Sequence, residues 1–342
     1  MQKTLLGLAI ATALSSTAVA NTDNSWLALD QEISNLSTTV VDNHGVAVSG
    51  FLSTYYGSNS DTDEGGWTWE AARLNFKVQV EDFKVKVSTD LKSGTATLKD
   101  AYVRWAVADD VDVTVGTFKR PFLYGYNVSG ANQLFLMRSA NAQNEVRDTG
   151  FMVSGGLGDI GTWAVAAQNG ADGVTDEHHF SARVVADVMG EGAFGKHEGG
   201  VDFFGADGTH ASVAIAIGQE NDTVEDYQKL GIEAAIAVAN FWAAVDMVDW
   251  TVDGTGLTAG GPADGEAPLG ITLAYMFQED VEVALRMDDL DRTDDTSIMT
   301  IGANYYQHLP HTVKWSLNFE SVSSDTTALE TDTIRLGMTL SF

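Results

Sequence analysis

The sequence predicts an all-β protein: a 16-stranded antiparallel transmembrane β-barrel with an inward-folded third outer loop and a short N-terminal helical segment. Two patterns carry this prediction. From about residue 44 onward, apolar and polar residues alternate with a period of two, in segments long enough to cross a bilayer as tilted strands. Between Gly116 and Arg147 the alternation stops and then resumes. An irregular segment of this length within a regular β framework is commonly functional.

The first twenty residues have the composition of a secretory signal peptide. Lys3 precedes a short apolar run, and Ala18-Val19-Ala20 supplies the small residues of a cleavage site. The run is too short for a membrane-spanning helix. We therefore expect export from the cytoplasm and cleavage after Ala20.

The next segment, residues 21–43, has a helical pattern. Its apolar residues are spaced three and four positions apart, as in a coiled coil: Trp26, Leu29, Ile33, Leu36 and Val40. About two heptads are too few to be stable alone. The segment is therefore either a loose polar tail or a short helix that pairs in an oligomer. The remainder, residues 44–342, is the expected barrel domain.

Each alternating segment has one apolar face and one polar face. In the last segment Leu336 and Leu340 fall on the apolar face, whereas Arg335 falls on the polar face. A charge that faces lipid at mid-bilayer costs ~2–4 kcal/mol, so the polar faces should point to a wet lumen. In segments 148–157 and 241–251 either face could point outward. The expected strands are 44–57, 66–81, 82–92, 97–108, 110–119, 148–157, 161–169, 177–189, 209–218, 226–239, 241–251, 268–278, 280–289, 297–307, 311–322 and 331–342.

The connections alternate in length. Those after odd-numbered strands are mostly longer and acidic, and those after even-numbered strands are mostly tight, which matches the outer loops and periplasmic turns of outer-membrane barrels. Residues 190–208 are an exception that the pattern does not explain: a long glycine-rich connection stands where a short turn is expected. A soluble β-sandwich would also alternate, but its strands would be shorter.

Composition excludes several functions. A net charge of −29 excludes a nucleic-acid partner, and the absence of cysteine removes thiol chemistry and thiolate metal sites. The sequence carries no G-x-S-x-G, H-E-x-x-H or phosphate-loop motif. We therefore expect no enzyme activity, no metal and no cofactor.

Basic residues are concentrated in one part of the chain. Eleven of the eighteen that remain after Lys3 is removed lie between Arg73 and Arg147. In a narrow lumen with low-dielectric walls such a cluster attracts anions, unless acids on neighbouring strands offset it. The candidate residues of a pore constriction and anion pathway are Arg73, Lys77, Lys84, Lys86, Arg104, Lys119, Arg120, Arg138 and Arg147. We expect the apolar residues of the irregular loop, Leu123 and Leu134 to Met137, to pack against this basic wall.

Residues 100–122, DAYVRWAVADDVDVTVGTFKRPF, resemble the phosphate-selective porin O and P family, above all in Gly116, Phe118-Lys119 and Pro121-Phe122. The resemblance implies a trimeric outer-membrane porin of a Gram-negative bacterium, embedded among outer-membrane lipid and lipopolysaccharide. Its solutes would be small hydrophilic molecules or anions. The inward arginines are sparser than in the family's phosphate pathway, so a non-selective or organic-solute porin and a structural or adhesive barrel remain alternatives.

Overall fold

The computed structural model describes residues 45–60, 65–143, 147–170, 178–194, 208–221, 226–253, 264–278, 280–292, 294–307, 312–326 and 329–342. The predicted signal peptide and the helical segment at 21–43 lie outside the described residues. Among the described residues, no helix is long and apolar enough to cross a membrane.

Sixteen antiparallel strands form one closed barrel, in which each strand pairs with its neighbours in sequence. They are β1 (Ala47–Asn59), β2 (Gly65–Val80), β3 (Phe83–Asp90), β4 (Thr97–Ala108), β5 (Val111–Lys119), β6 (Arg147–Gly156), β7 (Gly161–Gln168), β8 (His178–Met189), β9 (Thr209–Asn221), β10 (Asp226–Val238), β11 (Phe241–Asp253), β12 (Leu269–Gln278), β13 (Val281–Asp289), β14 (Ser297–Gln307), β15 (Val313–Ser323) and β16 (Thr331–Ser341). The predicted fold class is confirmed.

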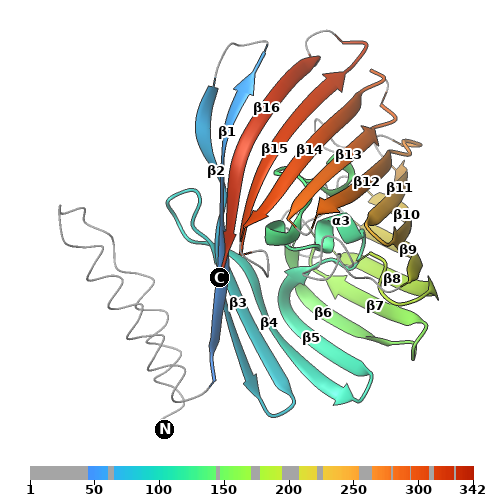
Figure 1. The fold of residues 1–342 in the computed structure, drawn as a ribbon. Helices are drawn as coiled ribbons and strands as arrows, with labels where there is room; N and C mark the ends of the chain where they lie inside the picture. Colours follow the sequence, from blue (N-terminus) through green and yellow to red (C-terminus); the bar gives the residue numbers. More distant parts are fainter. Residues whose placement is uncertain are drawn as a thin grey trace, which may run out of the picture. The chain divides into compact units, whose positions relative to one another are not determined.

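The first and last strands close the barrel (Figure 1). Phe51 of β1 lies opposite Ser341 of β16, and the pairing continues to Asn59 opposite Thr333. Two backbone hydrogen bonds, at 2.9 and 3.1 Å, join Gly50 to the C-terminal Phe342. Closure leaves no unpaired strand edge, which is what a sheet surrounded by lipid requires.

Most strands present an apolar outer face and a polar inner face. On β16, Leu336 is 50% exposed on the outside, whereas Arg335 points inward and pairs with Glu320 at 3.0 Å. β11 is mostly apolar on its inner face as well as on its outer face. Its inward Trp242 and Trp250 pack against other parts of the chain, so they do not face water. Its outward direction therefore could not be assigned from the alternation.

The two ends of the barrel differ. At one end, which we call the turn end, two residues join each of the pairs β2–β3, β4–β5, β10–β11 and β12–β13. The other end, the loop end, carries the connection from β5 to β6. The described part of this loop, residues 120–143, contains three short helices: α3 (Tyr124–Asn127), the 3-10 helix η1 (Gly130–Asn132) and α4 (Ala140–Gln143).

Candidate functional site: a lumen with one cationic wall

The β5–β6 loop folds into the barrel, as predicted. Helix α3 lies inside the ring of strands (Figure 1), and the side chains of Phe122, Leu123, Leu134 and Phe135 are each less than 5% exposed. Burial of such residues inside a polar lumen requires an apolar surface to receive them. The position of that surface determines which half of the lumen stays open.

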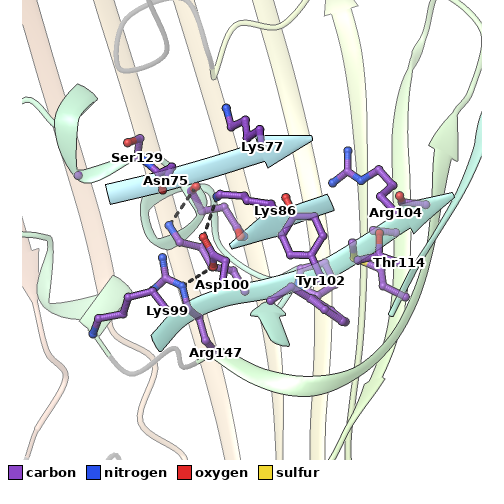
Figure 2. Close-up of a pocket in the computed structure, with 18 of the residues that line it drawn as sticks. Asn75, Lys77, Lys86, Lys99, Asp100, Tyr102, Arg104, Thr114, Ser129 and Arg147 are labelled. Carbon is purple, nitrogen blue, oxygen red and sulfur yellow. Dashed lines mark hydrogen bonds and ion pairs between the residues drawn. The ribbon is translucent and has the colours of Figure 1, made fainter. Parts of the chain in front are cut away.

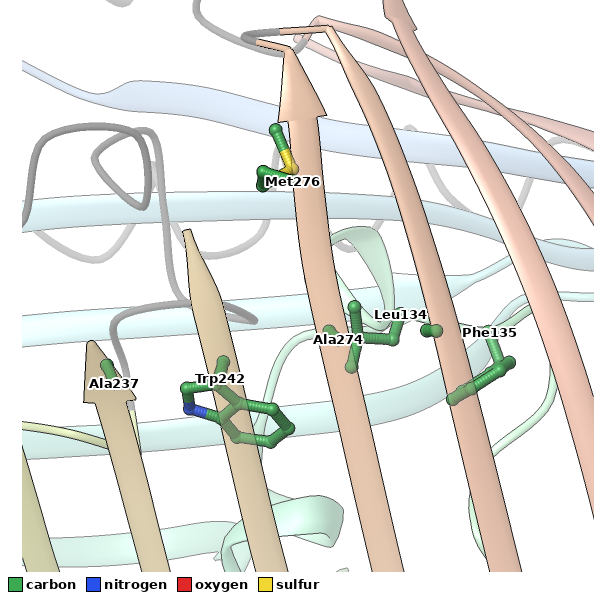
Figure 3. Close-up of a cluster of buried hydrophobic side chains, with 7 residues drawn as sticks. Leu134, Phe135, Ala237, Trp242, Ala274 and Met276 are labelled. Carbon is green, nitrogen blue, oxygen red and sulfur yellow. The ribbon is translucent and has the colours of Figure 1, made fainter. Parts of the chain in front are cut away.

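The loop packs against the inward faces of β9 to β16, which we call the docking wall. Phe122 and Leu123 form one cluster with Ala216, Val248 and Trp250. Leu134 and Phe135 form another, with residues of β10 to β13 (Figure 3) that include Ala237, Trp242, Ala274, Met276 and Ala284. The expectation that the loop packs against the basic wall from which it departs is therefore wrong. Many inward side chains of that wall are long and charged, among them Arg73, Lys77 and Lys86, so they offer less apolar surface than the docking wall.

Polar side chains of the docking wall bind the backbone of the loop. Asn304 Nδ2 donates to the carbonyl oxygen of Leu134 at 2.8 Å, and the amide of Leu136 donates to Asn318 Oδ1 at 2.8 Å. The amide of Tyr124 donates to Glu233 Oε1 at 2.6 Å. Further anchors come from Arg286, which donates to the carbonyl oxygen of Met137, and from Lys314, which donates to that of Gln133. Because these bonds satisfy buried backbone groups, the loop can remain irregular within the barrel.

Small inward residues make room for the loop. A Cβ atom built on Gly302 would lie 2.9 Å from the Phe135 ring, and one on Gly231 would lie 3.0 Å from the Phe122 ring. Inward alanines on β9, β10, β12 and β13 line the same surface. These small residues are a signal in the sequence that identifies the docking wall, and the sequence prediction did not use it.

The open part of the lumen is a cavity of about 1080 Å³ between the loop and the inward faces of β1 to β8, which we call the cavity wall. Among the described residues that line it are ten basic and six acidic side chains. Figure 2 shows several residues of the cavity lining, which come from neighbouring strands: Lys77, Lys86, Tyr102 and Arg104. Seven of the nine candidate residues line the cavity: Arg73, Lys77, Lys86, Arg104, Lys119, Arg138 and Arg147.

Acids on the cavity wall partly offset its cations. Asp100 accepts from both Lys86 and Arg147, each at 2.7 Å (Figure 2), and Asp90 pairs with Arg73 at 3.0 Å. The wall nonetheless keeps a basic surplus. Within the part of the chain that the structure describes, four lysines on the cavity make no ion pair: Lys77, Lys92, Lys99 and Lys119.

Two of the candidate residues, Lys119 and Arg138, hold the shape of the loop. Lys119 Nζ donates to the carbonyl oxygens of Tyr126, Asn127 and Val128 at 2.6, 3.2 and 3.0 Å. Arg138 donates to the carbonyl oxygens of Tyr126 and Val128 at 3.2 and 3.0 Å. Carbonyl groups at the C-terminal end of a helix are left without intrahelical donors, and cationic side chains satisfy them. Both residues therefore fix the end of α3 while they face the cavity.

Two candidate residues lie elsewhere. Arg120 is 1% exposed, and its Nη1 donates to Glu220 Oε2 at 3.2 Å and to the Tyr227 hydroxyl at 3.3 Å, beneath the start of the loop. Lys84 is exposed near the turn end of β3 and is not part of the cavity lining.

Lys99 lines the cavity although the sequence prediction did not select it. In the pairing of β3 with β4, Ser88 lies opposite Asp100 and Thr89 lies opposite Leu98, so Lys99 is an extra residue at a β-bulge. A bulge interrupts the two-residue alternation and redirects a side chain. For this reason alternation alone does not assign Lys99 to the lumen.

No protein-family model matches the chain, and no curated protein sequence matches it. Solved structures do match in fold. The outer membrane channel DcaP of Acinetobacter baumannii has a TM-score of 0.57 at 14% identity, covering 87% of this chain and 97% of its own. The anion-selective porin from Comamonas acidovorans has a TM-score of 0.58 at 11% identity, covering 87% and 99%. OmpT, an outer membrane protein of Vibrio cholerae, in its trimer form, has a TM-score of 0.58 at 10% identity, covering 87% and 99%. At these identities the likeness shows the fold: a closed sixteen-stranded barrel of the porin type.

Proposed function

We propose that this chain forms a water-filled channel in the outer membrane of a Gram-negative bacterium. Small hydrophilic solutes diffuse through it passively, and small anions pass in preference to cations. The observation that carries the proposal is the cavity, where ten basic and six acidic side chains face the open lumen of a chain whose net charge is −29. The field in a narrow, low-dielectric passage follows the charges of its own lining more than the charge of the whole molecule.

The reversal potential of the purified protein tests this proposal. The protein is reconstituted in a planar bilayer with a tenfold gradient of potassium chloride, and the potential at zero current is measured. Anion preference gives a reversal potential displaced toward the equilibrium potential of chloride. A displacement toward the equilibrium potential of potassium contradicts the proposed anion preference, although the protein would still be a channel.

Two other functions give different results in the same experiment. A non-selective or organic-solute porin of the same build gives a reversal potential near zero with a measurable conductance. A structural or adhesive barrel gives no conductance, and that result refutes the channel itself. The lumen favours the channel because its cavity has the volume of many water molecules rather than of a packed core.

The resemblance at residues 100–122 supports a finer proposal, in which phosphate-like anions are among the solutes and three copies assemble. OmpT of Vibrio cholerae, which shares the fold, occurs in a trimer form. Inhibition of chloride current by added phosphate tests the solute. The mass of the protein in detergent, measured by light scattering, tests the trimer.

A further inference from the structure

Residues 190–194, the described start of the connection after β8 where a short turn was expected, enter the lumen from the turn end. Ala193 is fully buried and Phe194 is 5% exposed, and both pack with Ala214 and Ala235 on the inward faces of β9 and β10. The barrel is thus entered from both ends, by the β5–β6 loop and by residues 190–194.

Several contacts hold residues 190–194 in this position. The amide of Gly192 donates to Asp187 Oδ1 at 3.1 Å, and Gly192 has a φ of +64°, a conformation in which glycine is favoured. Trp242 Nε1 donates to the carbonyl oxygen of Ala193 at 2.9 Å, and the amide of Ala193 donates to Ser212 Oγ at 2.9 Å. The segment is therefore anchored to the inward side chains of β8, β9 and β11 through the backbone groups of Gly192 and Ala193.

Phe194 contacts the first residue of α3. The Phe194 and Tyr124 rings have centroids 5.5 Å apart, and the Arg183 guanidinium lies 5.4 Å from the Phe194 centroid. Arg183 also donates to Glu233 Oε2 at 2.7 Å, and Glu233 accepts the amide hydrogen of Tyr124. Tyr124 is therefore held on its backbone side by the docking wall and on its ring side by Phe194.

We propose that Phe194 is a positioning residue for the pore: it supports α3 from the turn end and confines the open path to the cavity wall. This proposal rests on the proposed channel function. The physical reason is that removal of the Phe194 side chain would leave a gap beside α3. Without the Phe194 ring, Tyr124 loses the aromatic ring that packs against its own, and water enters between the loop and the strands β8 to β11. Arg183, which contacts the Phe194 ring and lines the cavity, then gains access to that space.

Two variants and one control test the proposal in planar bilayers. In Phe194→Ala the single-channel conductance rises above that of the wild type and the open level becomes noisier. Trp242→Phe removes the donor to Ala193 and part of the ring that packs with Leu134 and Phe135 but keeps an aromatic ring there, and it gives a smaller change in the same direction. Phe180→Ala is the matched control, because Phe180 lies on β8, the strand that precedes residues 190–194, and is 49% exposed on the outer face, away from the lumen. Equal conductance in Phe194→Ala, Phe180→Ala and the wild type overturns the proposal.

A chemical measurement separates this inference from the proposed function. The chain has no cysteine, so a single Ala235→Cys thiol reports the access of water to the surface beneath Phe194. A cationic methanethiosulfonate reagent should modify it slowly in the Ala235→Cys protein and at least tenfold faster when Phe194→Ala is added. Equal rates show that Phe194 does not cover this surface and overturn the inference. A wild-type barrel that does not conduct refutes the channel and with it the role of Phe194 in the pore, whichever thiol rate is found.

Discussion

At the residue scale, the charged groups of the lumen divide into those held in ion pairs and those left available to a solute. Asp100 is shared by Lys86 and Arg147, so neither cation offers its full charge to the cavity. Lys99 is half-buried on the same strand as Asp100 and has no ion pair with another described residue. An unpaired cation in a restricted space attracts an anion more strongly than a paired one does.

We expect Lys99→Glu to displace the reversal potential toward cation preference, because it converts an unpaired positive group on the cavity into a negative one. Lys84→Glu changes the net charge by the same amount at a position outside the cavity lining, and it should have a much smaller effect. Reversal potentials in a fixed salt gradient compare the two variants. Equal displacements would mean that net charge, and not the lining, controls selectivity.

Arg120 is buried and does not line the cavity, so we expect it to hold the β5–β6 loop in place and not to contact solutes. Its buried pair with Glu220 joins the start of the loop to β9. Removal of one partner of a buried ion pair costs about 3–5 kcal/mol, because the other group loses its counter-ion. In Arg120→Met, Glu220 loses the guanidinium but keeps its contacts with the Tyr227 hydroxyl and the His179 ring. We expect Arg120→Met to make the loop sensitive to protease in the folded, detergent-solubilised barrel. The double variant Arg120→Met with Glu220→Gln should regain most of the resistance, and a single variant as resistant as the wild type would contradict this role.

At the element scale, the loop and the docking wall are complementary in shape. Gly302 on β14 leaves space for the Phe135 ring, so a branched side chain there forces the loop away from the wall and toward the cavity. Overpacking of this kind costs about 1–3 kcal/mol. The cost falls on the docking of the loop and not on the strand pairing, since β13 to β15 keep their backbone hydrogen bonds.

We therefore expect Gly302→Val to lower the single-channel conductance while the barrel still folds. Ala303→Val is the matched control, because Ala303 is the next residue and is exposed on the outer face. Heat-dependent migration on electrophoresis gels checks that both variants fold. A conductance equal to that of the control would show that the loop accommodates the added side chain without narrowing the path.

At the scale of the whole molecule, the net charge and the lumen charge have opposite signs. Salt screens these contributions over about 30 Å at 0.01 M and about 3 Å at 1 M. We expect anion preference to be strongest in dilute salt and to fall steeply as the concentration rises toward 1 M. Permeability ratios from reversal potentials at several mean concentrations check this. A preference that stays constant would indicate selection by size or by a tight binding site in place of a field.

Local alternation determined most of the strand bounds. The fifth strand was expected at 110–119 and lies at Val111–Lys119, and the fourteenth lies at 297–307 as expected. Alternation works here because each residue of such a strand faces either outward or the lumen, and that choice is visible in a single side chain. It fails at a bulge, as Lys99 shows, and on β11, where the inner face is also apolar.

The sequence by itself determined that the chain closes into sixteen strands, that the regular pattern is interrupted between Gly116 and Arg147, and that most basic residues belong to one wall. Only the tertiary structure decided where that segment docks, that Arg120 is buried beneath it, and that residues 190–194 enter the lumen to meet Tyr124. The physical reason is the difference in sequence separation between the residues that determine the two kinds of feature. A strand's orientation depends on its own residues, whereas docking depends on small residues, such as Gly231 and Gly302, that lie far along the chain and meet the loop only in the folded barrel.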